Sequence, residues 1–167
     1  MKRKLILASN SPRRKELLQL CGVDFEVIPA QHEEPADKSL SIEKAIQHIA
    51  YSKALQVYNN HPDDLILAGD TIVYFNNEIL GKPKNEEDAK NMLKELSGTK
   101  HSVISAICFM SKEDTYIDYE ETDVWFAELS EKEIDWYIST GEPFGKAGSY
   151  AIQGKGGLFV EKIDGDI

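Results

Sequence analysis

The chain has 167 residues, of which 41% are hydrophobic and 29% charged, and its formal net charge at pH 7 is −10. This length suits one domain with a sizeable core, and no apolar run approaches the roughly 20 residues of a membrane span. A protein that coats nucleic acid needs a basic surface, which this acidic chain does not favour. We therefore expect a single domain over residues 1–167, located in the cytoplasm, with neither nucleic acid nor membrane as a partner.

The first predicted strand, residues 5–8, leads into a helix that begins near Ser11. Ser11 is a good N-cap and Pro12 a good first helical residue. Arg13 and Arg14 follow in the first turn, where cations oppose the helix dipole. A bound phosphate would compensate, but exposed arginines that tolerate a small penalty explain the pattern equally well. The helix should end near Cys21, which we expect in the core, as we do Cys108.

A long helix capped by Ser41 is predicted after a strand at residues 25–28 and an acidic loop at 31–35. Its apolar residues recur with helical spacing. Lys53 lies on the same stripe, about three turns after Ile42, so the core-facing side carries its ammonium. Judged alone, this pattern favours a stem that covers apolar surface while the charge reaches solvent.

Asp70 interrupts an apolar pattern, because strand-like residues 65–68 and 72–75 flank Gly69, Asp70 and Thr71. A carboxylate inside such a run is costly unless it is paired or binds a metal. Asp70 is therefore the best single candidate for chemistry. The alternative is a turn aspartate that bonds to nearby backbone, which the adjacent glycine makes plausible.

The remaining elements look structural. The sequence predicts a hairpin turn at Asn76 and Asn77, a helix from Asn85 that ends at Gly98, and a strand over residues 101–110. Strands near Tyr116 and at 124–126 precede a helix with a capping box at Ser130 and Glu133 that stops at residues 141–143.

The segment 145–157 is rich in glycine, which would let backbone approach a ligand closely. It matches neither common nucleotide fingerprint. The spacing from Gly148 to Gly154 is one residue too long for a phosphate-binding P-loop, and a dinucleotide motif starting at Gly154 would place its third glycine on Phe159. A turn-rich β segment is the alternative.

Taken together, these pieces resemble the Maf family of nucleoside triphosphate pyrophosphatases, once called septum formation inhibitors. The resemblance covers nearly the whole chain, and its order and spacing make it specific. The residues that carry it are Leu7 to Arg14, Glu33-Glu34, Lys53, Gly69-Asp70-Thr71, Gly81-Lys82-Pro83, Leu96-Ser97-Gly98, His101-Ser102-Val103, Lys146-Ala147-Gly148 and Tyr150 to Gly154.

The resemblance implies an α/β fold related to that of inosine triphosphatases, with an elongated mixed β-sheet, flanking helices and a central cleft between two lobes. It also implies hydrolysis at the α-phosphorus of a nucleoside triphosphate, assisted by Mg²⁺ or Mn²⁺. By this resemblance the catalytic residue is Asp70, and the metal residues are Glu33, Glu34 and Asp70. The substrate-binding residues would be Ser9, Arg13, Arg14, Lys53, Thr71, Lys82 and Gln153.

Within the family, Arg13, Thr71 and Gln153 resemble the branch that acts on dTTP and UTP. A glutamine amide offers both the donor and the acceptor that a thymine or uracil edge requires. The alternatives are a 7-methyl-GTP-type or broad-specificity pyrophosphatase, or a non-catalytic cell-division regulator or nucleic-acid-binding protein. A homodimer is a further possibility. Family members normally continue beyond the region matching residues 161–166 into a final helix, which this chain lacks.

Overall fold

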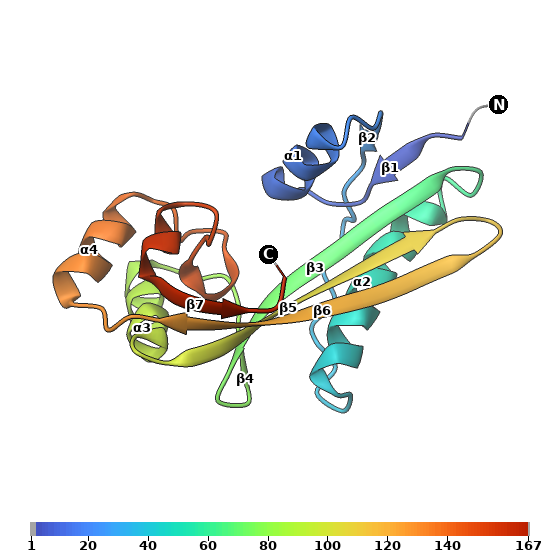
Figure 1. The fold of residues 1–167 in the computed structure, drawn as a ribbon. Helices are drawn as coiled ribbons and strands as arrows, with labels where there is room; N and C mark the ends of the chain where they lie inside the picture. The colour runs from blue at the N-terminus through green and yellow to red at the C-terminus, as the bar shows by residue number, and fades with distance from the viewer. Residues whose placement is uncertain (1–2, 167) are drawn as a thin grey trace. The chain divides into compact units, whose positions relative to one another are not determined.

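A computed structural model describes residues 3–166, so Met1, Lys2 and Ile167 of the predicted single domain lie outside the described part. Seven strands of the described chain form one sheet in the order β2-β1-β3-β5-β6-β7, with β4 paired to β3 (Figure 1). The strands are β1 (Leu5–Leu7), β2 (Glu26–Val27), β3 (Leu65–Phe75), β4 (Glu78–Leu80), β5 (Lys100–Met110), β6 (Thr115–Phe126) and β7 (Val160–Asp164).

Four α-helices and two short 3-10 helices complete the described chain. They are α1 (Pro12–Leu20), α2 (Ile42–Tyr58), α3 (Glu86–Leu96), α4 (Glu131–Ser139), η1 (Ala147–Ser149) and η2 (Lys155–Phe159). Strand β1 is parallel to both β2 and β3, whereas the β3–β4 and β6–β7 pairs are antiparallel. The predicted mixed α/β class is therefore confirmed.

The chain divides into two compact units. Unit 1 comprises Met1–Asp70 and Ser105–Tyr119, and unit 2 comprises Thr71–Ile104 and Glu120–Ile167. The division falls within the long strands β3, β5 and β6, and in β3 it separates Asp70 from Thr71. Helices α1 and α2 belong to unit 1, and helices α3 and α4 belong to unit 2.

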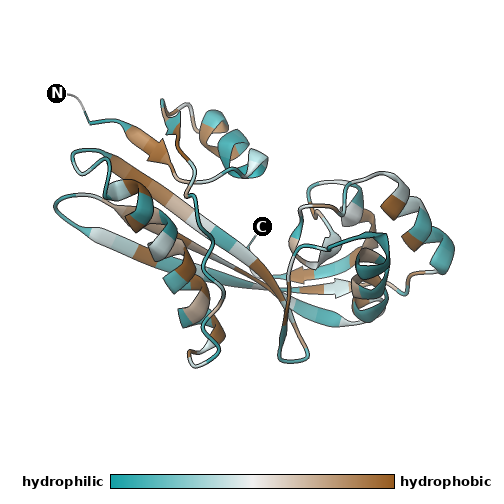
Figure 2. Cartoon of the chain, turned by 180° about the vertical axis from the view of Figure 1, so that it is seen from behind, coloured by the Kyte–Doolittle hydropathy of each residue, from teal (hydrophilic) through white to brown (hydrophobic). Residues whose placement is uncertain are grey.

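The core of unit 1 contains the apolar face of α2, as the helical spacing predicts. Ser41 precedes this helix in an extended conformation but makes no side-chain cap hydrogen bond, so the predicted cap is not formed. Figure 2 shows apolar residues along β1 and the first half of β3, where Ile6, Leu7 and Ile66 are buried. The buried apolar residues of α2 are Ala45, Ile46, Ile49, Ala50, Ala54 and Val57.

Unit 2 has its own core, formed mainly by α3, α4 and aromatic side chains of β6 and η2. Both helices begin as predicted: Asn85 Oδ1 accepts the Asp88 N–H at 2.8 Å, and Ser130 with Glu133 forms a capping box. The core members include Leu93, Leu96, Val124, Phe126, Ile134, Tyr137 and Phe159. None of the described helices is both long and apolar enough to cross a membrane.

Further details of the fold differ from the sequence-based expectations. Strand β3 runs unbroken through Gly69 and Asp70, so the alternative reading of Asp70 as a turn residue is wrong. Strand β6 is one continuous strand where two were expected. Cys21 is exposed instead of buried, because α1, which ends just before it, has no buried residue; Cys108 is buried as predicted.

Candidate active site

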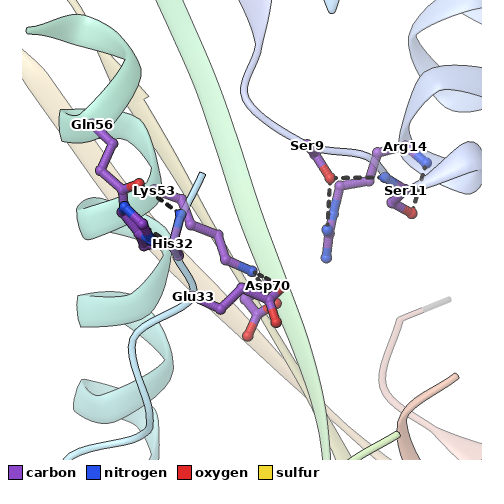
Figure 3. Close-up of polar contacts among 8 residues, drawn as sticks. All are labelled: Ser9, Ser11, Arg14, His32, Glu33, Lys53, Gln56 and Asp70. Carbon is purple, nitrogen blue, oxygen red and sulfur yellow. Dashed lines mark hydrogen bonds and ion pairs between the residues drawn. The ribbon is translucent and has the colours of Figure 1, made fainter. Parts of the chain in front are cut away.

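In unit 1, the carboxylates of Glu33 and Asp70 both contact the ammonium group of Lys53. The Nζ atom of Lys53 donates to Asp70 Oδ1 at 2.9 Å and to Glu33 Oε1 at 3.0 Å (Figure 3). Lys53 is only 7% exposed, whereas the Glu33 side chain is 65% exposed and that of Asp70 is 22% exposed. A buried ammonium is costly without partners, and here two carboxylates supply them.

Each member of this triad comes from a different segment. Lys53 projects from the buried face of α2, Asp70 lies on β3, and Glu33 lies on the segment before α2. His32 fastens that segment to the helix, because its N–H donates to Gln56 Oε1 at 3.1 Å and its carbonyl accepts from Gln56 Nε2 at 2.9 Å (Figure 3). Sequence reasoning missed Gln56, since a lone glutamine on a helix carries no distinctive pattern.

Arg14 is the second cation that the structure places near Asp70. Its Nη1 donates to Ser9 Oγ at 3.2 Å, and the same oxygen accepts the Ser11 N–H at 3.1 Å. Burial lowers the pKa of Arg14, while the nearby charges of Asp70 and Glu33 raise it. Arg14 therefore adds positive charge beside the triad.

The absence of a side chain at Gly69 leaves room for the Arg14 guanidinium next to β3. A Cβ atom at this position would lie 3.3 Å from Arg14 Nε and 2.9 Å from the Ala106 carbonyl oxygen. Distances this short are sterically unfavourable, so β3 needs a residue without a side chain here. The glycine that made a turn plausible in the sequence instead permits a close approach inside a strand.

Arg13 occupies a different environment from Arg14. Its Nη1 lies 3.2 Å from Glu16 Oε2, an ion pair on the exposed face of α1. Its Nε is buried and has no hydrogen-bond partner within the described chain. The predicted helix cap is confirmed, because Ser11 Oγ accepts the Arg14 N–H, although at the long distance of 3.5 Å.

The carboxylates predicted to hold a metal are not all brought together. Glu34 Oε2 lies 3.8 Å from His48 Nδ1, on exposed side chains. Among residues 3–166, no group of three or more His, Cys, Asp or Glu side chains could hold a metal ion. Glu33 and Asp70 nevertheless fit Mg²⁺, which is commonly held beside nucleotides by one or two carboxylates while phosphate oxygens supply other ligands.

The remaining predicted residues, Thr71, Lys82 and Gln153, belong to unit 2. Lys82 follows Gly81, whose carbonyl accepts the Gly148 N–H at 3.1 Å. Gln153 is exposed in the turn before η2 and lines an open hollow of about 390 Å³, together with residues of η2 and β7. A hollow of this size falls within the range of small-ligand sites.

A solved structure of a similar fold defines the fold class of this chain. The Ham1 protein of Staphylococcus aureus superimposes with a TM-score of 0.53 over 75% of this chain and 73% of that protein, at 14% sequence identity. The predicted relationship to this type of α/β fold is thereby confirmed.

Sequence comparison then identifies the family: residues 4–167 match the model of the Maf-like proteins, and the chain belongs to this family. Two relatives from Bacillus cereus strains are 49% and 50% identical over 98% of this chain and 86% of their own length. A relative from Bacillus anthracis is 49% identical over the same shares. All three carry the name dTTP/UTP pyrophosphatase.

Proposed function

We propose that this chain is a nucleoside triphosphate pyrophosphatase that hydrolyses dTTP and UTP to the monophosphate and pyrophosphate. The observation that carries the proposal is the identity of 49–50%, over 98% of the chain, to relatives named dTTP/UTP pyrophosphatase. The proposal includes a cytoplasmic location and a nucleoside triphosphate as the partner. The proposal also includes a homodimer, which a measurement of the molar mass in solution by light scattering would test.

Asp70 is the proposed general base. Its carboxylate is partly exposed, so water can reach it, and Lys53 fixes its orientation. The carboxylate takes a proton from the water molecule that attacks the α-phosphorus. A divalent cation held by Glu33 and Asp70 would supply Lewis-acid polarisation of the phosphate oxygens.

The cationic side chains stabilise the leaving group in this proposal. Arg14 and Lys53 lie beside Asp70 in unit 1, and Lys82 lies in unit 2. Ser9 orients the guanidinium of Arg14 through its hydroxyl. Positive groups that face the departing pyrophosphate offset the negative charge that develops on it, which lowers the activation barrier.

Gln153 is the proposed determinant of base choice, with Thr71 and Arg13 as further contacts. The exposed amide of Gln153 can donate to O4 and accept from N3–H of thymine or uracil. A purine presents a different pattern, so a site matched to the pyrimidine edge would leave polar groups unpaired when a purine enters.

The decisive experiment measures pyrophosphate release from dTTP, UTP, dGTP, dATP and 7-methyl-GTP with Mg²⁺ or Mn²⁺. We expect the highest kcat/KM for dTTP and UTP. Asp70→Asn should lower turnover roughly 10²–10⁴-fold while the protein stays folded. Asp63→Asn is the matched control, because Asp63 is an exposed aspartate of the same unit. An Asp70→Asn variant with activity within tenfold of wild type would defeat the assignment.

A further inference from the structure

The turn that carries Gln153 is held on one side by Tyr137 of α4 and on the other by Glu142, which lies in the turn just after this helix. This turn, residues 151–156, contains one backbone hydrogen bond, from the Gly154 N–H to the Ala151 carbonyl at 3.0 Å. Gln153 itself is exposed. Its direction therefore depends on how the backbone of the turn is fixed.

Glu142 fixes the side of the turn that follows Gln153. Its Oε1 accepts the Lys155 N–H at 3.0 Å, and its Oε2 accepts the Gly156 N–H at 2.9 Å. Hydrogen bonds to an ionised carboxylate are stronger than those between neutral groups. One carboxylate thus binds two successive amides. Burial opposes ionisation of Glu142, but these bonds, together with a hydrogen bond from Tyr137, hold its pKa below the ordinary value.

Tyr137 fixes the side that precedes Gln153. Its hydroxyl oxygen accepts the Ala151 N–H at 3.1 Å, and its ring is fully buried, 5.0 Å from the ring of Phe159 between centroids. Burial, and then a hydrogen bond to Glu142, raise the pKa of Tyr137. The two side chains therefore form one connected unit, which we call the Tyr137–Glu142 clamp.

The glycines of the turn are explained by this clamp. A Cβ atom at Gly154 would collide with the Glu142 carboxylate, and one at Gly156 would lie 2.8 Å from the Tyr137 hydroxyl oxygen. Larger residues at either position would push the backbone away from its hydrogen-bond partners. The glycine-rich pattern thus serves contacts within unit 2.

We propose that Tyr137 and Glu142 are positioning residues for Gln153 and thereby help to determine which nucleobase the enzyme accepts. The inference rests on the proposed function, in which the amide of Gln153 reads the base edge. Neither residue touches the reacting phosphate in this proposal. A displacement of about 1 Å in a positioned group is enough to cost substantial rate.

The test compares Tyr137→Phe and Glu142→Ala with Glu133→Ala as a matched control. Glu133 lies on α4, the helix that carries Tyr137, and caps its N-terminal end, so its loss should lower the melting temperature without altering the turn. The ratio of kcat/KM for dTTP to that for dGTP is measured for each protein. We expect both clamp variants to lower this ratio roughly tenfold, mainly through KM for dTTP, and the control to keep it.

Amide hydrogen exchange gives a second readout that does not depend on activity. The Ala151 amide should exchange faster in Tyr137→Phe, and the Lys155 and Gly156 amides should exchange faster in Glu142→Ala. If Glu142→Ala does not fold, the test rests on Tyr137→Phe, which removes the hydroxyl group but keeps the buried ring and should therefore stay folded. An unchanged substrate ratio in a folded clamp variant would overturn the inference while leaving the proposed function intact. A wild-type enzyme without pyrimidine preference would overturn both.

Discussion

Replacement of His101 by phenylalanine should make the protein less sensitive to acid. His101 lies on β5 and is only 2% exposed. Its Nε2 is 2.7 Å from the Tyr150 hydroxyl oxygen, and its Nδ1 has no partner within residues 3–166. Burial lowers the pKa of His101 to about 4, although the charge of Asp123 opposes this effect.

The free energy follows from the difference between folded and unfolded pKa values. In the unfolded chain the pKa of a histidine is near 6.5, so the unfolded state takes up the proton first as the pH falls. The gap to about 4 corresponds to about 3 kcal/mol. This destabilisation is absent above pH 6.5, grows as the pH falls toward 4, and is complete below about 4.

Urea denaturation at a series of pH values from 7 to 4 measures this effect. We expect the wild-type free energy of unfolding to fall by about 3 kcal/mol more than that of His101→Phe over this range. Subtracting the two curves removes the contribution of carboxylates common to both proteins. Parallel curves, or a His101 titration near pH 6.5 by NMR, would refute the reasoning.

Three further predictions concern the site. Lys53→Ala should lower the free energy of unfolding by about 1–3 kcal/mol in urea denaturation, because it leaves the Asp70 and Glu33 carboxylates without their shared ammonium. Arg14→Ala should reduce kcat/KM for dTTP more than Arg13→Ala does, since the charge of Asp70 acts on Arg14 whereas Arg13 pairs with Glu16; equal losses in steady-state assays would contradict this ordering. Gln153→Glu should depress dTTP hydrolysis at least roughly tenfold, because a carboxylate cannot donate to O4, and an unchanged rate would exclude the pyrimidine-edge contact.

Local signals predicted most of the secondary structure correctly. The helix beginnings at Ser11, Asn85 and Ser130 were predictable because each cap depends on residues within one turn. The turn at Asn76 and Asn77 was predictable because asparagine tolerates the positive φ values of 50° and 62° found there. The family resemblance and the α/β class are confirmed as well.

The environment of the site residues depends on contacts that are distant in sequence. The spacing of α2 alone favoured a Lys53 charge in solvent, whereas Glu33 and Asp70 stabilise it in a buried position. The clamp role of Tyr137 and Glu142 was also missed, because their partners lie 13 and 14 residues away. The functional roles of the predicted site residues stay predictions.

Gly69 shows that an unreactive residue can set the conditions for a reactive one. A chain with alanine at this position would keep every ionisable side chain of the site. The added methyl group would nevertheless lie too close to the Arg14 guanidinium and to the Ala106 carbonyl oxygen. Either β3 or one of these neighbours would have to move. Two proteins with identical charged residues could therefore differ in activity at this position alone. A search for active relatives that matched only the charged side chains would not distinguish them.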